Sequence, residues 1–159
     1  MEPPSGSPIT AAVDVLGDRW TLLVLRDIIF FDRRHFRALL TGSTEGIASN
    51  ILADRLKRLL DAGLLARGGA AVRGQRARFS LTEAGIRTLP IICALGRWGV
   101  DWRSASDDSP AWQLLRDEGP AIVEELMDEL RVRHLEAAAN PHDGPGAFER
   151  LAAAGGYPA

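Results

Sequence analysis

The sequence predicts a mainly helical α+β domain that carries one short β-hairpin and continues into a helical C-terminal extension. Three observations support this prediction. Leucines recur with helical spacing between residues 49 and 62, a glycine-punctuated turn separates two strand-like segments between residues 64 and 81, and an acidic amphipathic stretch follows residue 119. Apolar residues make up 46% of the 159 residues, so the chain can bury a core and wholesale disorder is not expected.

Three helices are expected before the leucine-rich segment, after a Pro/Gly/Ser-rich lead-in over residues 1–7. The first covers residues 10–16. Asp18 then occupies a capping position for a second helix, which runs to about residue 30 and is apolar on more than one face. Such a pattern is typical of a central, buried helix. Asp32 is expected to cap a third, short helix that reaches residue 40.

The leucine-rich segment predicts a fourth helix over about residues 49–62, which Gly63 should end as a C-terminal cap. Ser49 lies at its N-terminal end, and polar or charged side chains occupy the face opposite the leucines: Asn50, Asp54, Lys57, Arg58 and Asp61. Strands are expected at 64–67 and 76–81, and they form a hairpin whose tip and second arm carry arginines.

Thr82 is placed to cap a long helix that runs to about Trp102, and Pro90 should kink this helix because it removes one backbone hydrogen bond. Residues 104–110 are the best linker candidate. The chain therefore divides into the lead-in, a main domain over 8–103 and an acidic extension over 104–159. Within the extension a helix is expected over 120–139, with one apolar stripe: Ile122, Val123, Leu126, Met127 and Leu130.

Charge is distributed unevenly along the chain. The net charge is −2, but residues 19–78 hold 12 Lys and Arg against 5 Asp and Glu, whereas residues 104–159 hold 4 against 11. Such asymmetry indicates a basic functional segment beside an acidic tail.

The order of the expected elements is that of a winged helix-turn-helix, in which the helix over 49–62 lies in the major groove of DNA. From its polar face Asn50 can bond an adenine edge, and Lys57 can bond guanine O6 or N7. Asp54 could accept from cytosine N4 or could pair with Arg58 four residues on. The sequence therefore predicts a DNA-binding protein, and Ser49 joins these four residues as a candidate contact.

The hairpin, over about residues 67–80, would form the wing. Its arginines, Arg73, Arg76 and Arg78, are placed to reach phosphates or the minor groove. Arg34 and His35 lie at the start of the first helix of the helix-turn-helix and are added as candidate DNA contacts.

Five stretches, in this order, resemble the HxlR-type regulators, relatives of the MarR group: GDRWTLLVLRD (17–27), HFRALL (35–40), GIASNILADRLKRLLDAGLL (46–65), FSLTEAG (79–85) and the run of Pro90, Leu95, Trp98 and Gly99. The resemblance covers about residues 8–103. It implies a bacterial, dimeric DNA-binding regulator that acts on neighbouring genes and whose terminal helices form the dimer interface.

Two positions depart from this family. The family usually has a cysteine before the first proline, which in several members senses electrophiles, whereas Ser7 precedes Pro8 here. The wing commonly contains Pro-Pro-Arg, and this chain has Gly74-Gln75-Arg76. We therefore expect no electrophile sensing at the N-terminus and a looser wing with a basic tip.

One recognition helix covers few base pairs, so a homodimer on a palindromic operator is expected. The long helix is the candidate interface because it has apolar and small residues to spare, namely Leu89, Ile92, Leu95, Gly96, Gly99 and Trp102. The apolar stripe of the tail needs burial as well, either across the dimer, which we favour, or on its own subunit. A pocket for an unidentified small-molecule effector is hypothesised between long helix and tail, near Trp98, Trp102 and Trp112.

Other functions receive less support. No Gly-rich phosphate loop, nucleophile elbow or HExxH motif is present, so we expect no enzyme and no cofactor. The spacing of His134, His142 and Asp143 matches no known metal site. Cys93, the only cysteine, fits a small buried residue in a reducing cytoplasm.

Neither a signal peptide nor a membrane span is expected, because the N-terminus lacks a basic and an apolar region and the most apolar stretch is too short. The alternative to DNA binding is a winged-helix module that binds proteins or ligands. Such a module need not keep a basic groove face and wing, whereas a regulator should bind duplex DNA with a strong dependence on salt.

Overall fold

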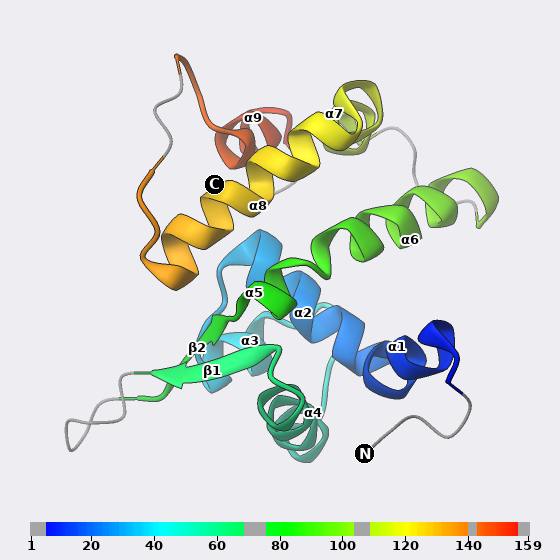
Figure 1. Ribbon diagram of the computed structural model, residues 1–159, viewed down its shortest axis with the longest axis vertical. Coiled ribbons are helices and arrows are strands. Elements are labelled where there is room, and N and C mark those ends of the chain that lie inside the picture. The colour runs from blue at the N-terminus through cyan, green and yellow to red at the C-terminus, as the bar shows by residue number, and fades with distance from the viewer. Residues whose placement is uncertain (1–5, 69–75, 104–108, 140–142, 156–159) are drawn as a thin grey trace.

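The computed structural model describes residues 6–68, 76–103, 109–139 and 143–155, and Figure 1 shows their arrangement. Its elements, in chain order, are α1 (Pro8–Leu16), α2 (Arg19–Phe31), α3 (Phe36–Gly42), α4 (Ser49–Asp61), β1 (Leu65–Gly68), β2 (Arg78–Leu81), α5 (Glu83–Ile86), α6 (Leu89–Trp102), α7 (Pro110–Glu118), α8 (Pro120–Leu135) and α9 (Ala147–Ala153). The predicted fold class, mainly helical with a two-stranded wing, is confirmed.

The C-terminal helices α7, α8 and α9 form a layer over α2 and α5 (Figure 1). A single buried cluster joins the two layers: it includes Leu25 and Ile28 from α2, Leu126 and Leu130 from α8, and Phe148 from α9. Over the described part of the chain, no helix has the length and apolar character needed to cross a membrane.

Asp18 caps α2 as expected. Its carboxylate accepts hydrogen bonds from the backbone N–H of Trp20 and Thr21, at 3.0 and 3.1 Å. The same oxygen accepts from Arg55 Nε at 2.7 Å, so the cap also ties the start of α2 to α4.

The expectation for Asp32 is wrong. Asp32 follows the last residue of α2 and ends that helix in the left-handed conformation, with φ 49°. His35 stands at the N-cap of α3 instead, without a side-chain capping bond. An Asp between two helices fits either role, because Asp tolerates the left-handed region as well as a capping position.

The hairpin pairs β1 with β2 in antiparallel register, from Leu65 opposite Leu81 to Gly68 opposite Arg78. Gly63 lies just after α4 with φ +73°, as predicted for a C-terminal glycine, and turns the chain from α4 into β1. The hydroxyl of Thr82 donates to the carbonyl of Gly63 at 2.6 Å. This bond joins the segment before β1 to the residue after β2 and so closes the base of the hairpin.

The long helix predicted from Thr82 to Trp102 is two helices. Thr82 caps α5 through the backbone N–H of Gly85, and the chain then breaks at Arg87 and Thr88 before α6 begins. Pro90 lies in the first turn of α6, where its missing N–H leaves no helical bond unmade. The proline therefore starts a new helix rather than kinking a continuous one.

The extension folds back onto its own subunit. Ile122, Leu126, Met127 and Leu130 of α8 are buried within the chain, so this part of the apolar stripe is not available to a second copy. The helix ends at Leu135, because Glu136 adopts φ 54°, rather than at residue 139. The helices α7 and α9 were not predicted from the sequence.

Candidate nucleic-acid interface

The helix α4 presents its polar face to solvent. Leu52, Leu56 and Leu59 are buried against α2, α3 and β1, and the opposite face is exposed. That face carries Ser49, Asn50, Asp54, Lys57 and Arg58, the residues predicted for base and phosphate contacts. The heptad-like leucine spacing positions them by fixing which side of the helix faces the core.

Acidic neighbours hold the cations of this face in ion pairs. Lys57 Nζ lies 2.6 Å from Asp61 Oδ2, and Arg58 Nε lies 3.0 Å from Asp54 Oδ2. The hydrogen bond to Asp61 raises the pKa of Lys57, so the lysine stays charged. Both pairs are exposed, and exposed pairs contribute little stability, so either cation can exchange its carboxylate for a phosphate or a base.

A hollow of about 410 Å³ lies between α3 and the described end of the wing. It is lined by His35, Arg37, Ala38, Thr41 and Arg76. His35 contributes its Nδ1 to a hydrogen bond with the carbonyl of Ala77 at 3.1 Å, which places the start of α3 next to the wing. Arg37 is exposed here and was not predicted as a DNA contact. The helix α3 is too short for its hydrophobic periodicity to show which residues face solvent.

The expectation that Arg34 contacts DNA is wrong. Arg34 is buried, and its guanidinium donates to three acceptors within the chain. Nε donates to the carbonyl of Phe79 at 3.1 Å, Nη1 to the carbonyl of Arg133 at 3.2 Å, and Nη2 to the hydroxyl of Ser80. Burial lowers the pKa of this arginine, with nearby Arg78 as a second cause. Arg34 therefore joins the wing to the tail.

Of the three arginines predicted for the wing, two lie in the described part of the chain. Arg76 and Arg78 are exposed, whereas Arg73 lies outside the described residues. Arg78 opens β2 and faces away from the core, so its charge is available at the surface.

His134, at the end of α8, is a second link between tail and wing. Its Nδ1 accepts a hydrogen bond from the backbone N–H of Leu81 at 2.9 Å. Burial lowers the pKa of His134 to about 3, with Arg34 as a further cause, so the ring is neutral. Within the described ranges, no three potential ligand side chains gather closely enough to bind a metal ion.

The residues predicted for a dimer interface are divided between interior and surface. Leu89 and Ile92 are buried in the chain's own core, and Trp112 packs on Gly96 so closely that a Cβ there would lie 1.9 Å from its ring. The helices α2, α7 and α8 pack against this side of α6, so Leu89 and Ile92 serve the core of their own chain. Leu95 and Trp102 are exposed, and a Cβ at Gly99 would meet no atom within 4 Å.

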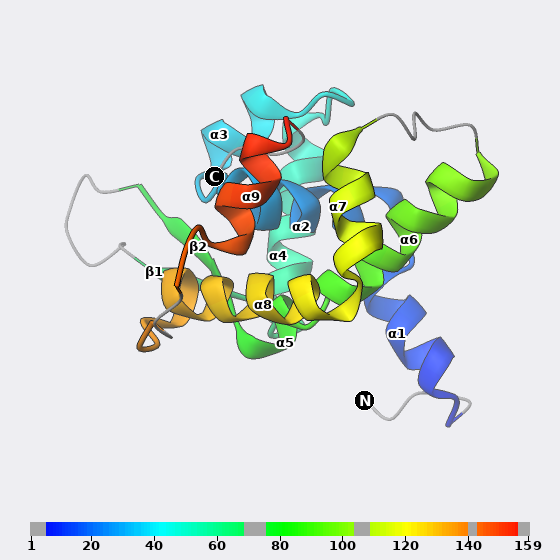
Figure 2. The same cartoon turned by 90° about the horizontal axis from the view of Figure 1, so that it is seen from above.

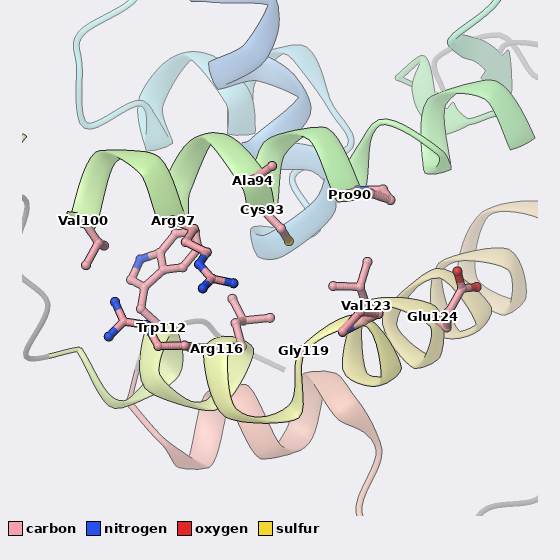
Figure 3. A pocket seen from close by; sticks show the side chains of 12 residues that line it. Pro90, Cys93, Ala94, Arg97, Val100, Trp112, Arg116, Gly119, Val123 and Glu124 are labelled. Carbon is pink, nitrogen blue, oxygen red and sulfur yellow. The ribbon is translucent and has the colours of Figure 1, made fainter. Parts of the chain in front are cut away.

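A cleft of about 340 Å³ separates α6 from α7 and the start of α8, close to where a pocket was hypothesised (Figure 3). Trp112 lines it. Trp98 and Trp102 do not, because they lie on the outer side of α6 with exposed fractions of 57% and 73%. Cys93 also lines the cleft, and burial raises the pKa of its thiol to about 11.

Comparison with known proteins agrees with this geometry. A model of the HxlR-like helix-turn-helix family matches residues 15–107. A protein of Mycobacterium tuberculosis (strain H37Rv), named as an uncharacterized HTH-type transcriptional regulator, is 34% identical over 74% of this chain. The chain spans 65% of that relative's length. A regulator of the same description from Synechocystis is 32% identical over 71% of this chain and 81% of its own length.

Solved structures show the same architecture. The crystal structure of PA1607, described as a transcription factor, has a TM-score of 0.58 and 32% identity, and the match covers 67% of this chain and 72% of that one. The redox regulator HypR in its reduced form has a TM-score of 0.54 and 26% identity, over 61% of this chain and 94% of that one. The matching sequence model, the exposed face of α4 and the paired wing together place the chain in the HxlR-like helix-turn-helix family.

Proposed function

We propose that the protein is a dimeric, sequence-specific DNA-binding transcription regulator. In this proposal α4 enters the major groove, and the wing with the α3 hollow follows the phosphate backbone. The observation that carries it is the surface formed by the polar face of α4 and the basic side chains beside it. Asn50 and Lys57 stand on α4, and Arg37 and Arg76 stand at the hollow between α3 and wing.

The chemistry of this surface suits DNA better than a protein partner. Arginine and lysine neutralise phosphates, and asparagine pairs with adenine through two hydrogen bonds. Arg37, Arg58, Arg76 and Arg78 are all exposed. The names of the mycobacterial and cyanobacterial relatives add support, since both are called HTH-type transcriptional regulators.

The dimer half of the proposal rests on an uncovered apolar surface. The residues concerned are Ile9 and Val13 on α1 and Leu95, Trp98 and Trp102 on α6, all exposed by more than 45%. Both helices project from the same side of the molecule in Figures 1 and 2, opposite the wing. Large exposed apolar patches mark interaction sites. A second copy seated here would leave both α4 helices free to reach successive major grooves, about 34 Å apart.

Selection from a pool of random duplex DNA tests the proposal without a known operator. Repeated binding and amplification should enrich a palindrome, and the affinity for that palindrome should fall steeply as salt concentration rises. A matched control is Arg87→Ala: Arg87 is exposed and follows α5, outside the helices α3 and α4 and the wing, so the variant should bind DNA like wild type. A pool that stays random, with retention independent of salt, would favour the protein-binding alternative.

A further inference from the structure

The cleft beside α6 combines an apolar lining with two cations at one end (Figure 3). Pro90, Cys93 and Ala94 line it from α6, and Leu115 and Val123 line it from α7 and α8. Its volume of about 340 Å³ lies within the range of small-molecule sites, about 300 to 1,000 Å³.

The two cations are Arg97 of α6 and Arg116 of α7. Both pair with Asp101: the distance to its carboxylate is 3.8 Å from Arg97 Nε and 3.1 Å from Arg116 Nη2. Two guanidinium groups thus share one carboxylate, so this group of three carries one excess positive charge. Figure 3 shows both arginines beside the indole of Trp112, with Glu124 at the opposite end of the cleft.

We propose that this cleft binds a small apolar carboxylate, with its ring against Trp112 and its carboxylate against the guanidinium groups of Arg97 and Arg116, whose charge Asp101 only half compensates. A planar guanidinium matches the two oxygens of a carboxylate, and an aromatic wall accepts a flat apolar body. The raised pKa keeps the Cys93 thiol neutral, so the middle of the cleft is uncharged. The carboxylate of Glu124 at the far end disfavours a second anionic group.

The occupant of the cleft would act on the wing through α8, and this step rests on the proposed function. Pro120, Val123 and Glu124, in the first turns of α8, line the cleft. At the other end of the same helix the backbone carbonyl of Arg133 accepts a hydrogen bond from Arg34, and Nδ1 of His134 accepts one from the N–H of Leu81 in β2. The helix α8 has 16 residues and is about 24 Å long, so it directly connects the cleft with the hydrogen bonds to Arg34 and β2.

The cleft is formed in part by helices that lie outside the region matched by the family model, whereas α4 and the wing lie within it. The family model ends at residue 107, whereas α7 and α8 begin at Pro110 and Pro120. The cleft therefore exists because the extension folds against α6, and it offers a regulatory site that the matched domain does not form by itself.

Calorimetric titration of the full chain, without DNA, tests the binding step with 2-naphthoate and its uncharged analogue 2-naphthamide as probes. Wild type should bind naphthoate more tightly. Changing Arg97→Gln and Arg116→Gln together should weaken naphthoate by about fivefold, as expected for exposed charges, and leave naphthamide unaffected. Retained naphthamide binding also shows that the variant is folded. Arg87→Gln, outside the cleft, should bind both probes like wild type.

Equal wild-type affinities for the two probes, or no heat with either at millimolar concentration, would overturn the binding proposal. For the α8 link, naphthoate should change the affinity of wild type for its selected DNA and leave that of the double Arg variant unchanged. Linkage requires DNA to change the naphthoate affinity by the same factor. If wild type binds naphthoate and its DNA affinity does not change, the link through α8 is refuted. If wild type binds naphthoate but selects and binds no DNA, the proposed function is refuted and the binding proposal stands.

Discussion

Replacing Arg34 by alanine should destabilise the fold, although sequence reasoning placed this arginine on DNA. The side chain is buried and makes three hydrogen bonds, to the carbonyls of Phe79 and Arg133 and to the hydroxyl of Ser80. A hydrogen bond from a charged donor contributes about 1.5 to 3 kcal/mol. Water can enter the space that the truncated side chain leaves, so we expect the free energy of unfolding to fall by about 3 kcal/mol rather than by the full sum.

Urea unfolding followed by circular dichroism measures this change, and Arg37→Ala is the matched comparison. Arg37 lies three residues away and is exposed, so its loss should leave stability within about 0.5 kcal/mol of wild type while weakening DNA binding. The reverse result, a stable Arg34→Ala that loses DNA binding and a destabilised Arg37→Ala, would refute the roles assigned to the two arginines.

Four further predictions concern single residues. Asn50→Ala and Lys57→Ala should each weaken binding to the selected palindrome by about 1 to 3 kcal/mol with the fold intact, measured by gel shift. Arg76→Ala should weaken all duplexes alike and lower the salt slope by about one unit. The neutral His134 has its pKa lowered to about 3, so the unfolded chain alone takes up a proton as pH falls from about 6.5 to 3. Stability should drop over that window in thermal melts, and less so in His134→Asn. Cys93 should react slowly with Ellman's reagent at pH 7, because its raised pKa leaves little thiolate.

Each of these predictions can fail separately. Unchanged affinity for both α4 variants would remove the helix from the groove, and an unaltered salt slope would remove Arg76 from the phosphates. A pH profile of His134→Asn identical to wild type would mean that another group controls acid stability. Rapid labelling of the native thiol would show that Cys93 is reactive and that the reagent reaches it through the cleft.

Elements with strong local signals were predictable from the sequence. Asp18 capped α2 and Gly63 ended α4 because capping and positive φ depend on a few neighbouring residues. Pro90 indicated that the helix is interrupted near this position, but the sequence did not show whether the proline kinks one helix or starts a second, because proline can do either.

Contacts between distant segments were not predictable. Arg34 lies in a basic stretch, and only its approach to Phe79 and Arg133 shows that it is a structural side chain. Leu89 and Ile92 had the pattern of an interface, but an apolar helical face does not reveal whether the same chain or a second copy covers it. The short helix α9 has only seven residues, too few for a clear period.

Sedimentation velocity of the protein with its selected palindromic duplex decides whether two copies of the chain read the DNA together. We expect one complex that contains two 17.2 kDa chains per duplex, and a duplex with only one half-site should bind much more weakly. A single chain that binds the full palindrome tightly, or a protein that sediments apart from the DNA, would contradict it.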